Sequence, residues 1–178
     1  MKINKKLTDP ILHWCLHDPN RQRYFRDPGY HSGNVLGQTQ LEYVSPKILL
    51  GDFPYAELFE IQKNLLQYYN FKDFYIDPEF GIMISYSEEG HEVHKHIDNN
   101  YRDADIHTRI NVMISKPEEG GLAVIDNQVI DVEENEPWLC VAGHYEHYST
   151  KVKGKKPRLV ISFGYQINKE ELKEKKWI

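Results

Sequence analysis

Residues 82–98 read IMISYSEEGHEVHKHID, with two short β-prone runs (82–86 and 93–98) on either side of a polar turn. In the second run, His96 and Asp98 are two residues apart, so on a strand both side chains would point to the same face. An imidazole and a carboxylate that share a face are candidate ligands of one metal ion.

More β-prone runs follow along the chain, separated by turn residues, at 108–114, 122–125, 138–142 and 159–165. Short strands at this spacing predict a sandwich or a barrel. Upstream, apolar residues recur at helical spacing over 55–69, which predicts an amphipathic helix.

The length of 178 residues fits a single domain spanning 1–178. We expect a helical and loop-rich support layer over 1–80 and a β core over 81–167. A C-terminal helix is expected over 168–178, where Asn168 and Glu171 have the spacing of a capping box.

Side chains on two of the predicted strands divide into a polar and an apolar face. The polar-face positions are His107, Arg109, Asn111 and Met113 on one strand and Arg158, Val160, Ser162 and Gly164 on the other. The alternating positions are mostly apolar. We therefore predict a barrel whose interior is lined by polar groups and whose apolar face is covered by the helices.

A second imidazole from a distant strand would complete a metal site. The candidates are His144 and His147, both just past the 138–142 run. Two histidines and one carboxylate form the facial triad of non-haem iron(II) sites, which leaves coordination positions open. Arg158 follows on the polar face of the next strand. A buried guanidinium needs an anionic partner, and an acidic co-substrate can supply one through a bidentate salt bridge.

With these residues, the stretch 86–165 resembles the iron(II)/2-oxoglutarate-dependent oxygenases, and within them the prolyl-hydroxylase-like branch. Three further features match that family: Tyr86 and Gly90 ahead of His96, Arg109 at the start of the following strand, and the pair Gly120-Gly121 before the next one. The resemblance implies a mainly β fold with flanking helices, namely a double-stranded β-helix (jelly-roll, cupin-like barrel) backed by N-terminal helices.

The resemblance also implies the chemistry. His96, Asp98 and His147 would hold Fe(II), and Arg158 would bind the distal carboxylate of the co-substrate 2-oxoglutarate. The expected enzyme is a dioxygenase that uses O2 to hydroxylate an amino acid, a peptidyl proline or another small substrate, with release of succinate and CO2. From the residues alone, His144 stays open as the alternative to His147.

Other residues are expected around this centre. We assign Tyr86, Asn111 and Ser162 to co-substrate binding, Asn111 because the late third-strand Tyr of the prolyl-hydroxylase branch is missing here. Arg109 and His94 are assigned to substrate binding. The polar stretch 99–106 is predicted to be a lid over the metal.

Two other interpretations remain open. The spacing of Gly90 and His96 also resembles the start of a cupin motif, so a cupin-type metal enzyme that does not use 2-oxoglutarate is one alternative. A non-catalytic barrel that binds a small acid is the other.

The formal charge of −5 argues against general nucleic-acid binding, so the expected partner is a small-molecule or peptide substrate. The basic run 151–158 is predicted to be a solvated turn, with an anion contact as the alternative.

Cys15 and Cys140 lack metal-type spacing and suggest free thiols in a reducing compartment. No run is apolar enough for a signal peptide or a bilayer span, so we expect a cytoplasmic protein without membrane association.

Overall fold

Two antiparallel sheets form the body of the protein, seen in a computed structural model that describes residues 1–19, 25–26, 38–42, 52–78 and 81–178. The larger sheet has the order β1-β2-β4-β10-β5-β8, with β3 also paired to β10, and the smaller has the order β7-β6-β9. The helices are α1 (Lys5–His17), α2 (Tyr55–Tyr69) and α3 (Lys169–Glu174). The strands are β1 (Phe25–Arg26), β2 (Gln38–Glu42), β3 (Phe74–Ile76), β4 (Ile82–Ser87), β5 (Asp105–Ser115), β6 (Ala123–Ile125), β7 (Gln128–Ile130), β8 (Pro137–Cys140), β9 (His147–Ser149) and β10 (Arg158–Asn168).

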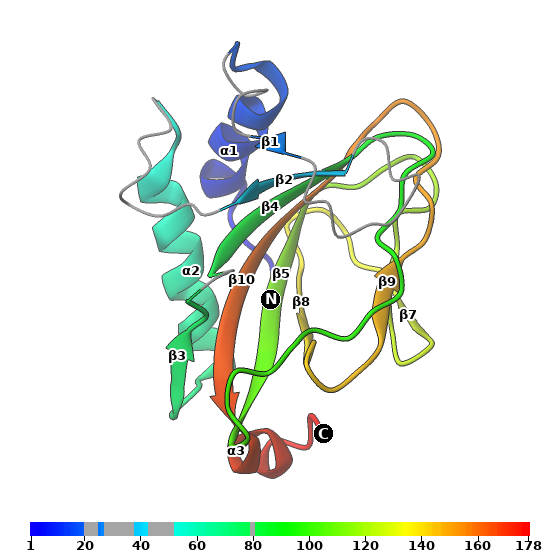
Figure 1. Cartoon of the computed structure of the whole chain (residues 1–178). Coiled ribbons are helices and arrows are strands. Elements are labelled where there is room, and N and C mark those ends of the chain that lie inside the picture. Colours follow the sequence, from blue (N-terminus) through cyan, green and yellow to red (C-terminus); the bar gives the residue numbers. More distant parts are fainter. Residues whose placement is uncertain (20–24, 27–37, 43–51, 79–80) are drawn as a thin grey trace.

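After β4 the chain alternates between the two sheets. Residues 91–98 run beside β9, β5 returns to the large sheet, β6 and β7 lie in the small one, and β8, β9 and β10 continue the alternation. Helices α1 and α2 stand on the opposite side of the large sheet from the small sheet (Figure 1). This winding is a double-stranded β-helix backed by N-terminal helices, as the sequence predicts.

Five of the six predicted strands are present, with ends that differ by a few residues. The strand predicted over 93–98 is wrong, because only His96 forms a bridge there, to His147. Next to it, the backbone N–H of Val93 donates to Ser149 Oγ instead of to a carbonyl. Strands β1, β2, β3, β7 and β9 were not predicted; apart from β2, each has only two or three residues.

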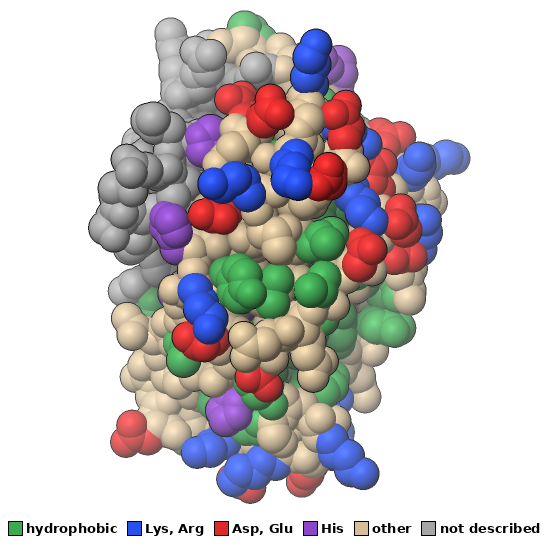
Figure 2. Space-filling view, turned by 90° about the vertical axis from the view of Figure 1, so that its right-hand side faces the viewer, with side chains coloured by type: hydrophobic (Ala, Val, Ile, Leu, Met, Phe, Trp, Pro, Cys, Tyr) green, Lys and Arg blue, Asp and Glu red, His purple; other side chains and the backbone are tan. Residues whose placement is uncertain are grey.

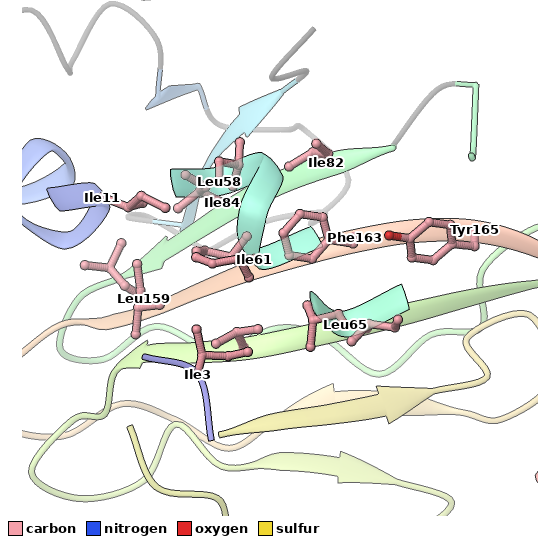
Figure 3. Packing of buried hydrophobic residues seen from close by; sticks show 14 of the residues in the cluster. Ile3, Ile11, Leu58, Ile61, Leu65, Ile82, Ile84, Leu159, Phe163 and Tyr165 are labelled. Carbon is pink, nitrogen blue, oxygen red and sulfur yellow. The ribbon is translucent and has the colours of Figure 1, made fainter. Parts of the chain in front are cut away.

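The main hydrophobic core lies between the large sheet and helices α1 and α2 (Figure 3). The apolar faces predicted for β5 and β10 point into it, with Ile110, Val112, Leu159, Ile161 and Phe163 all fully buried. Burying each such side chain stabilises the fold by about 1.5–3 kcal/mol. The predicted division of the two strands into a core face and an opposite face is therefore confirmed.

Helix α2 spans the predicted residues 55–69 and buries Leu58, Ile61 and Leu65 on one face. It ends at Asn70, which takes the left-handed conformation (φ 51°). Helix α1 was not predicted, because Pro10 lies inside it and normally breaks a helix. Its buried face, which includes Ile11 and Trp14, compensates by packing on the core.

The C-terminal helix α3 follows the predicted cap residue Asn168 but ends at Glu174, short of the predicted 178, and the predicted capping box is wrong. Asn168 accepts a hydrogen bond from the backbone N–H of Glu170. The Glu171 carboxylate does not reach back to Asn168 and accepts from the backbone N–H groups of Lys72 and Asp73 instead. The glutamate therefore ties α3 to the connection between α2 and β3.

The outer face of the small sheet is the side shown in Figure 2, where hydrophobic side chains gather among charged ones. Cross-strand pairing puts Val124 between Val129 and Tyr148. The exposed ion pair of Lys153 with Glu119 agrees with a solvated turn for this part of the basic run, whereas Arg158 at its end is buried. None of the helices in the described ranges has the length and hydropathy needed to cross a membrane.

Candidate metal centre

Three predicted ligands come together where the segment 91–98 meets β9. His96, Asp98 and His147 each offer a ligand atom, and these atoms lie within 4.8 Å of one another. The imidazole centroids of His96 and His147 are 4.2 Å apart, and His96 Nε2 is 3.4 Å from Asp98 Oδ1. In the part of the chain that the structure describes, this is the one such group of at least three metal-binding side chains.

Backbone carbonyls orient both imidazoles. His96 Nδ1 donates to the carbonyl of His94 at 2.6 Å, and His147 Nδ1 donates to the carbonyl of Tyr145 at 3.1 Å. With the proton on Nδ1, each Nε2 has its lone pair available for a metal ion. The reciprocal backbone hydrogen bonds between His96 and His147, at 2.9 and 3.1 Å, fix the distance between the two rings.

The two oxygens of Asp98 face different surroundings. Oδ1 points to His96, whereas Oδ2 lies 3.4 Å from Arg109 Nε and 3.5 Å from His107 Nε2. Burial by itself would raise the pKa of Asp98. The hydrogen bond to His96 and the charges of Arg109, His107 and His147 outweigh it and hold this pKa well below its usual range. Asp98 is therefore held as a carboxylate, the form that binds a metal ion.

The same cluster affects the two imidazoles in opposite ways. Burial alone would lower the pKa of His96, but its hydrogen bond to Asp98 gives a net increase. The pKa of His147 is lowered, by burial and by the neighbouring His96 charge. Two neutral imidazoles and one carboxylate are the donor set of non-haem iron(II) sites, so the residues present fit Fe(II).

Arg158 lies on the interior face of β10, away from the core. Its side chain is 5% exposed, and its Nε donates to the carbonyl of Gly121 at 2.7 Å. Within the described ranges, no carboxylate lies within ion-pair distance of the guanidinium, and burial lowers the pKa of Arg158 to about 10. Gly121 is needed here because its φ is 63° and a Cβ would meet Pro117 Cγ at 2.7 Å. Among the residues that the structure describes, the site therefore presents a buried cation that lacks an anionic partner.

The structure does not bring Tyr86 together with Arg158. Tyr86 is paired with Leu159, packs on the main core, and donates from its hydroxyl to Glu88 Oε1 at 2.8 Å. The residues of β4 that share the Arg158 face are Met83, Ser85 and Ser87, and Ser87 is the direct partner of Arg158. Both hydroxyl oxygens are buried without a hydrogen-bond partner among the described residues. Because side chains alternate along a strand, the two serines lie on the Arg158 face and Tyr86 lies on the opposite face. The serines are therefore better placed than Tyr86 for the predicted contact with the co-substrate.

Ser162 and Asn111 are paired across β10 and β5 and are both buried on the interior face, as predicted. The Ser162 hydroxyl accepts from Arg109 Nη1 at 2.9 Å. The other contacts of Arg109 include Asp98 and Met83, so its observed role is to hold the candidate metal ligand. The assignment of Arg109 to substrate binding stays a prediction.

The two remaining predicted histidines lie beside the ligands. His94 supplies the carbonyl that orients His96. His144 is exposed, packs its ring on Tyr145 at 4.6 Å, and is not part of the group of three. The geometry therefore favours His147 over His144.

The stretch 99–106 is fastened to the body of the protein near Asp98. Asn100 accepts from the backbone N–H of His107 at 2.9 Å and donates to the carbonyl of Gly143 at 3.0 Å. Arg102 lies over the Tyr75 ring at 4.7 Å. The exposed part of this loop borders a polar depression of about 280 Å³ next to His144. Its proposed role as a lid stays a prediction.

Sequence reasoning did not assign His107, Asp77 or Gln166 to the site. His107 Nδ1 donates to Asp77 Oδ2 at 2.9 Å, and Gln166 Nε2 donates to the same oxygen at 2.9 Å. The position of His107 on the polar face was visible in the sequence. Its link to Asp77 was not, because that contact depends on how β3 joins the sheet.

Comparisons with known proteins bear on the fold. No protein-family model matches the sequence, and no curated protein matches it. Solved structures do match. A prolyl hydroxylase from Trichoplax adhaerens, in complex with a peptide fragment of the hypoxia inducible factor oxygen degradation domain, superposes with a TM-score of 0.62 and 16% identity over 96% of this chain and 84% of that one.

Two other structures match similarly. A viral collagen prolyl hydroxylase from Paramecium Bursaria Chlorella virus-1, in its 2-oxoglutarate complex, has a TM-score of 0.60 and 10% identity over 93% of this chain and 92% of that one. An oxidoreductase of the 2OG-Fe(II) oxygenase family from Burkholderia pseudomallei has a TM-score of 0.58 and 10% identity over 76% of this chain and 69% of that one. The structural neighbours of this chain are thus 2-oxoglutarate/Fe(II) oxygenases, prolyl hydroxylases prominent among them, and it shares their double-stranded β-helix fold.

Proposed function

We propose that this protein is an Fe(II)/2-oxoglutarate-dependent dioxygenase that hydroxylates an amino acid, a peptidyl proline or another small substrate. One observation carries the proposal. His96, Asp98 and His147 offer three ligand atoms to one metal ion, and among the described residues the buried guanidinium of Arg158 has no carboxylate within ion-pair distance. A metal ion held by the three ligands and a dicarboxylate paired with Arg158 would satisfy both groups together.

Each group of residues has its own role in this proposal. His96, Asp98 and His147 would hold the metal, and Arg109 keeps Asp98 Oδ2 turned toward β5. Arg158 would bind the distal carboxylate of 2-oxoglutarate through its Nη atoms, with the hydroxyls of Ser85 and Ser87 on the same face. Bound Fe(II) and 2-oxoglutarate would supply the oxidation of the substrate by O2, with release of succinate and CO2.

The interior of the barrel between the metal ligands and Arg158 supports the binding of an organic acid. Met113 and Val160 are paired there and pack with Trp138 and Ala123 in a small buried apolar cluster. Such a lining excludes water, which strengthens an ion pair between Arg158 and a carboxylate. The prolyl hydroxylases among the structural neighbours support an amino acid or a peptide as substrate.

The test is the visible spectrum of the purified protein with Fe(II) and 2-oxoglutarate under strict anaerobiosis. A weak metal-to-ligand charge-transfer band is expected, absent in Asp98→Ala and weakened in Arg158→Ala. His144→Ala is the matched control, since His144 is a nearby exposed histidine outside the group, and it should keep the band. With a band established, 2-oxoglutarate turnover is screened against amino acids and peptides.

No band at saturating Fe(II) and 2-oxoglutarate would contradict the proposal. A cupin-type metal enzyme would then bind the metal but not the keto acid. A binding barrel would bind the acid without the metal.

A further inference from the structure

A buried polar cluster lies behind Asp98, on the side away from His96 and His147. It consists of Asp77, His107 and Gln166, whose exposed fractions are 2%, 2% and 0%. The Asp77 carboxylate accepts from His107 Nδ1 and from Gln166 Nε2, each at 2.9 Å. The other ring nitrogen, His107 Nε2, lies 3.5 Å from Asp98 Oδ2.

The fold assembles this cluster from three strands. His107 on β5 and Gln166 on β10 are direct cross-strand partners. Asp77 directly follows β3, and its backbone N–H donates to the carbonyl of Gly164 at 3.0 Å. Because each member is fixed by the backbone of the large sheet, the imidazole of His107 has little freedom to turn.

The cluster is costly if it only fills space. A carboxylate and an imidazole buried together pay a desolvation penalty that apolar residues of similar size would avoid. His107 Nε2 is also buried without a hydrogen bond among the described residues, and its polar neighbour there is Asp98. This orphaned nitrogen points to a role of the cluster toward Asp98.

We propose that His107 is a positioning residue for the metal centre, with its ring held by Asp77 and Gln166. His107 Nε2 and Arg109 Nε lie 3.5 and 3.4 Å from Asp98 Oδ2. A proton on Nε2 would complete a hydrogen bond to Oδ2, so that Asp98 binds the metal through Oδ1 alone. The inference rests on the proposed function, because it assigns Asp98 as a metal ligand.

The consequence is a measurable coupling between a remote carboxylate and the metal. Without the cluster, Arg109 alone restrains the Asp98 carboxylate, and Oδ2 can approach the metal more easily. Loss of a group that orients a metal ligand typically weakens metal binding by about 10–100-fold. Asp77 contacts His107, which in turn faces Asp98, so an effect of its substitution on the metal is expected to pass through His107.

The experiment measures the Kd of Mn(II) by EPR titration, without 2-oxoglutarate or O2. Asp77→Asn keeps the shape of the side chain but removes its charge, and it should weaken Mn(II) binding roughly tenfold or more. Thr8→Val is the matched control. It also removes a buried polar contact, between Thr8 and Asn135, but on helix α1 and with no link to Asp98. Its Kd should stay within about twofold of the wild type.

Two further measurements separate positioning from general loosening. If Asp77 acts through His107, the double variant Asp77→Asn/His107→Asn should bind Mn(II) no more weakly than His107→Asn alone. The visible spectrum of bound Co(II) should also change in Asp77→Asn, since a second Asp98 oxygen on the metal alters its coordination number. If Asp77→Asn does not fold, Gln166→Met tests the same hydrogen-bonded cluster with a smaller change.

The outcomes are distinct from those of the proposed function. A wild-type protein that binds no divalent metal overturns both proposals. A wild type that binds metal, with an Asp77→Asn variant of unchanged Kd and Co(II) spectrum, overturns only the positioning role. Equal weakening in Thr8→Val, or additive effects in the double variant, also overturns it.

Discussion

Replacing Arg158 by Met should have opposite effects on stability and on co-substrate binding. Burial lowers the pKa of Arg158 to about 10 from an ordinary value of 12.5, and one pKa unit corresponds to about 1.4 kcal/mol. Burying the charge without an anion therefore costs about 3 kcal/mol. Methionine relieves that cost but leaves the Gly121 carbonyl without its donor, which costs about 1–3 kcal/mol.

The net change in the free energy of unfolding of the unliganded protein is then between zero and about 2 kcal/mol in favour of Arg158→Met. For a chain of this size that is a Tm between unchanged and about 8 °C higher. The affinity for 2-oxoglutarate should fall in the same variant. Two charge-assisted hydrogen bonds to its distal carboxylate contribute roughly 1.5–3 kcal/mol each, so the Kd should rise by about 10²–10⁴-fold.

Thermal unfolding with and without 2-oxoglutarate, in the presence of Mn(II), measures both effects. At a ligand concentration of about 100 Kd, the wild type gains about 2.7 kcal/mol, whereas Arg158→Met at the same concentration should gain almost nothing. Arg158→Lys is the control that keeps the charge but loses the planar fork, and its Kd should lie between those of the other two.

Two results would refute this reasoning. An unliganded Arg158→Met variant destabilised by several kcal/mol would show that the guanidinium already has a structural partner. A variant that keeps the full 2-oxoglutarate-dependent increase in Tm would show that the acid binds elsewhere.

Three other predictions concern the metal centre and its loop. His147→Ala should abolish Mn(II) binding measured by EPR, and the same substitution at His144 should leave the Kd within about twofold; the reverse pattern would make His144 the ligand. Mn(II) affinity should rise as the pH is raised through and above 6.5. The pKa of His96 is raised, so a proton must leave its imidazole before the metal binds. A pH-independent Kd would contradict this. Gly143→Ala should destabilise the protein by about 1–3 kcal/mol, since the added Cβ would lie 1.9 Å from Asn100 Oδ1. Hydrogen exchange should then accelerate over 99–105, and unchanged protection there would show that Asn100 does not fasten the loop.

The parity of β-strands explains why much of the site could be predicted from the sequence. The pairing of β10 with β4 is regular, and its pairing with β5 shifts only between Leu159 and Val160, so Arg109, Asn111, Arg158 and Ser162 were placed on the correct face. The ligands His96 and Asp98 also converge as predicted, although the reason given was wrong. Their segment is not a strand, and backbone bonds to β9 bring His96 beside His147.

What failed needed information that a local pattern does not contain. Tyr86 was assigned by its spacing from His96, but its face depends on its register against Leu159 on β10. The partnership of His107 with Asp77 likewise depends on the pairing of β3 with the end of β10. Helix α1 was missed because the local signal of Pro10 opposes it, and packing on the core outweighs that signal.

The interior face itself corrects the prediction of a uniformly polar barrel. Along β10 the interior residues are Arg158, Val160 and Ser162, and Val160 is paired with Met113 in an apolar cluster. An apolar belt therefore separates the Arg158 end from the Ser162–Arg109–Asp98 end. A polar channel would hydrate both ends, and each charge would then be satisfied by water. If the proposed function holds, such an apolar belt would leave Arg158 without compensation among the described residues unless an acid spanned it, so the apolar residues would contribute to the selection of the co-substrate together with the charged ones.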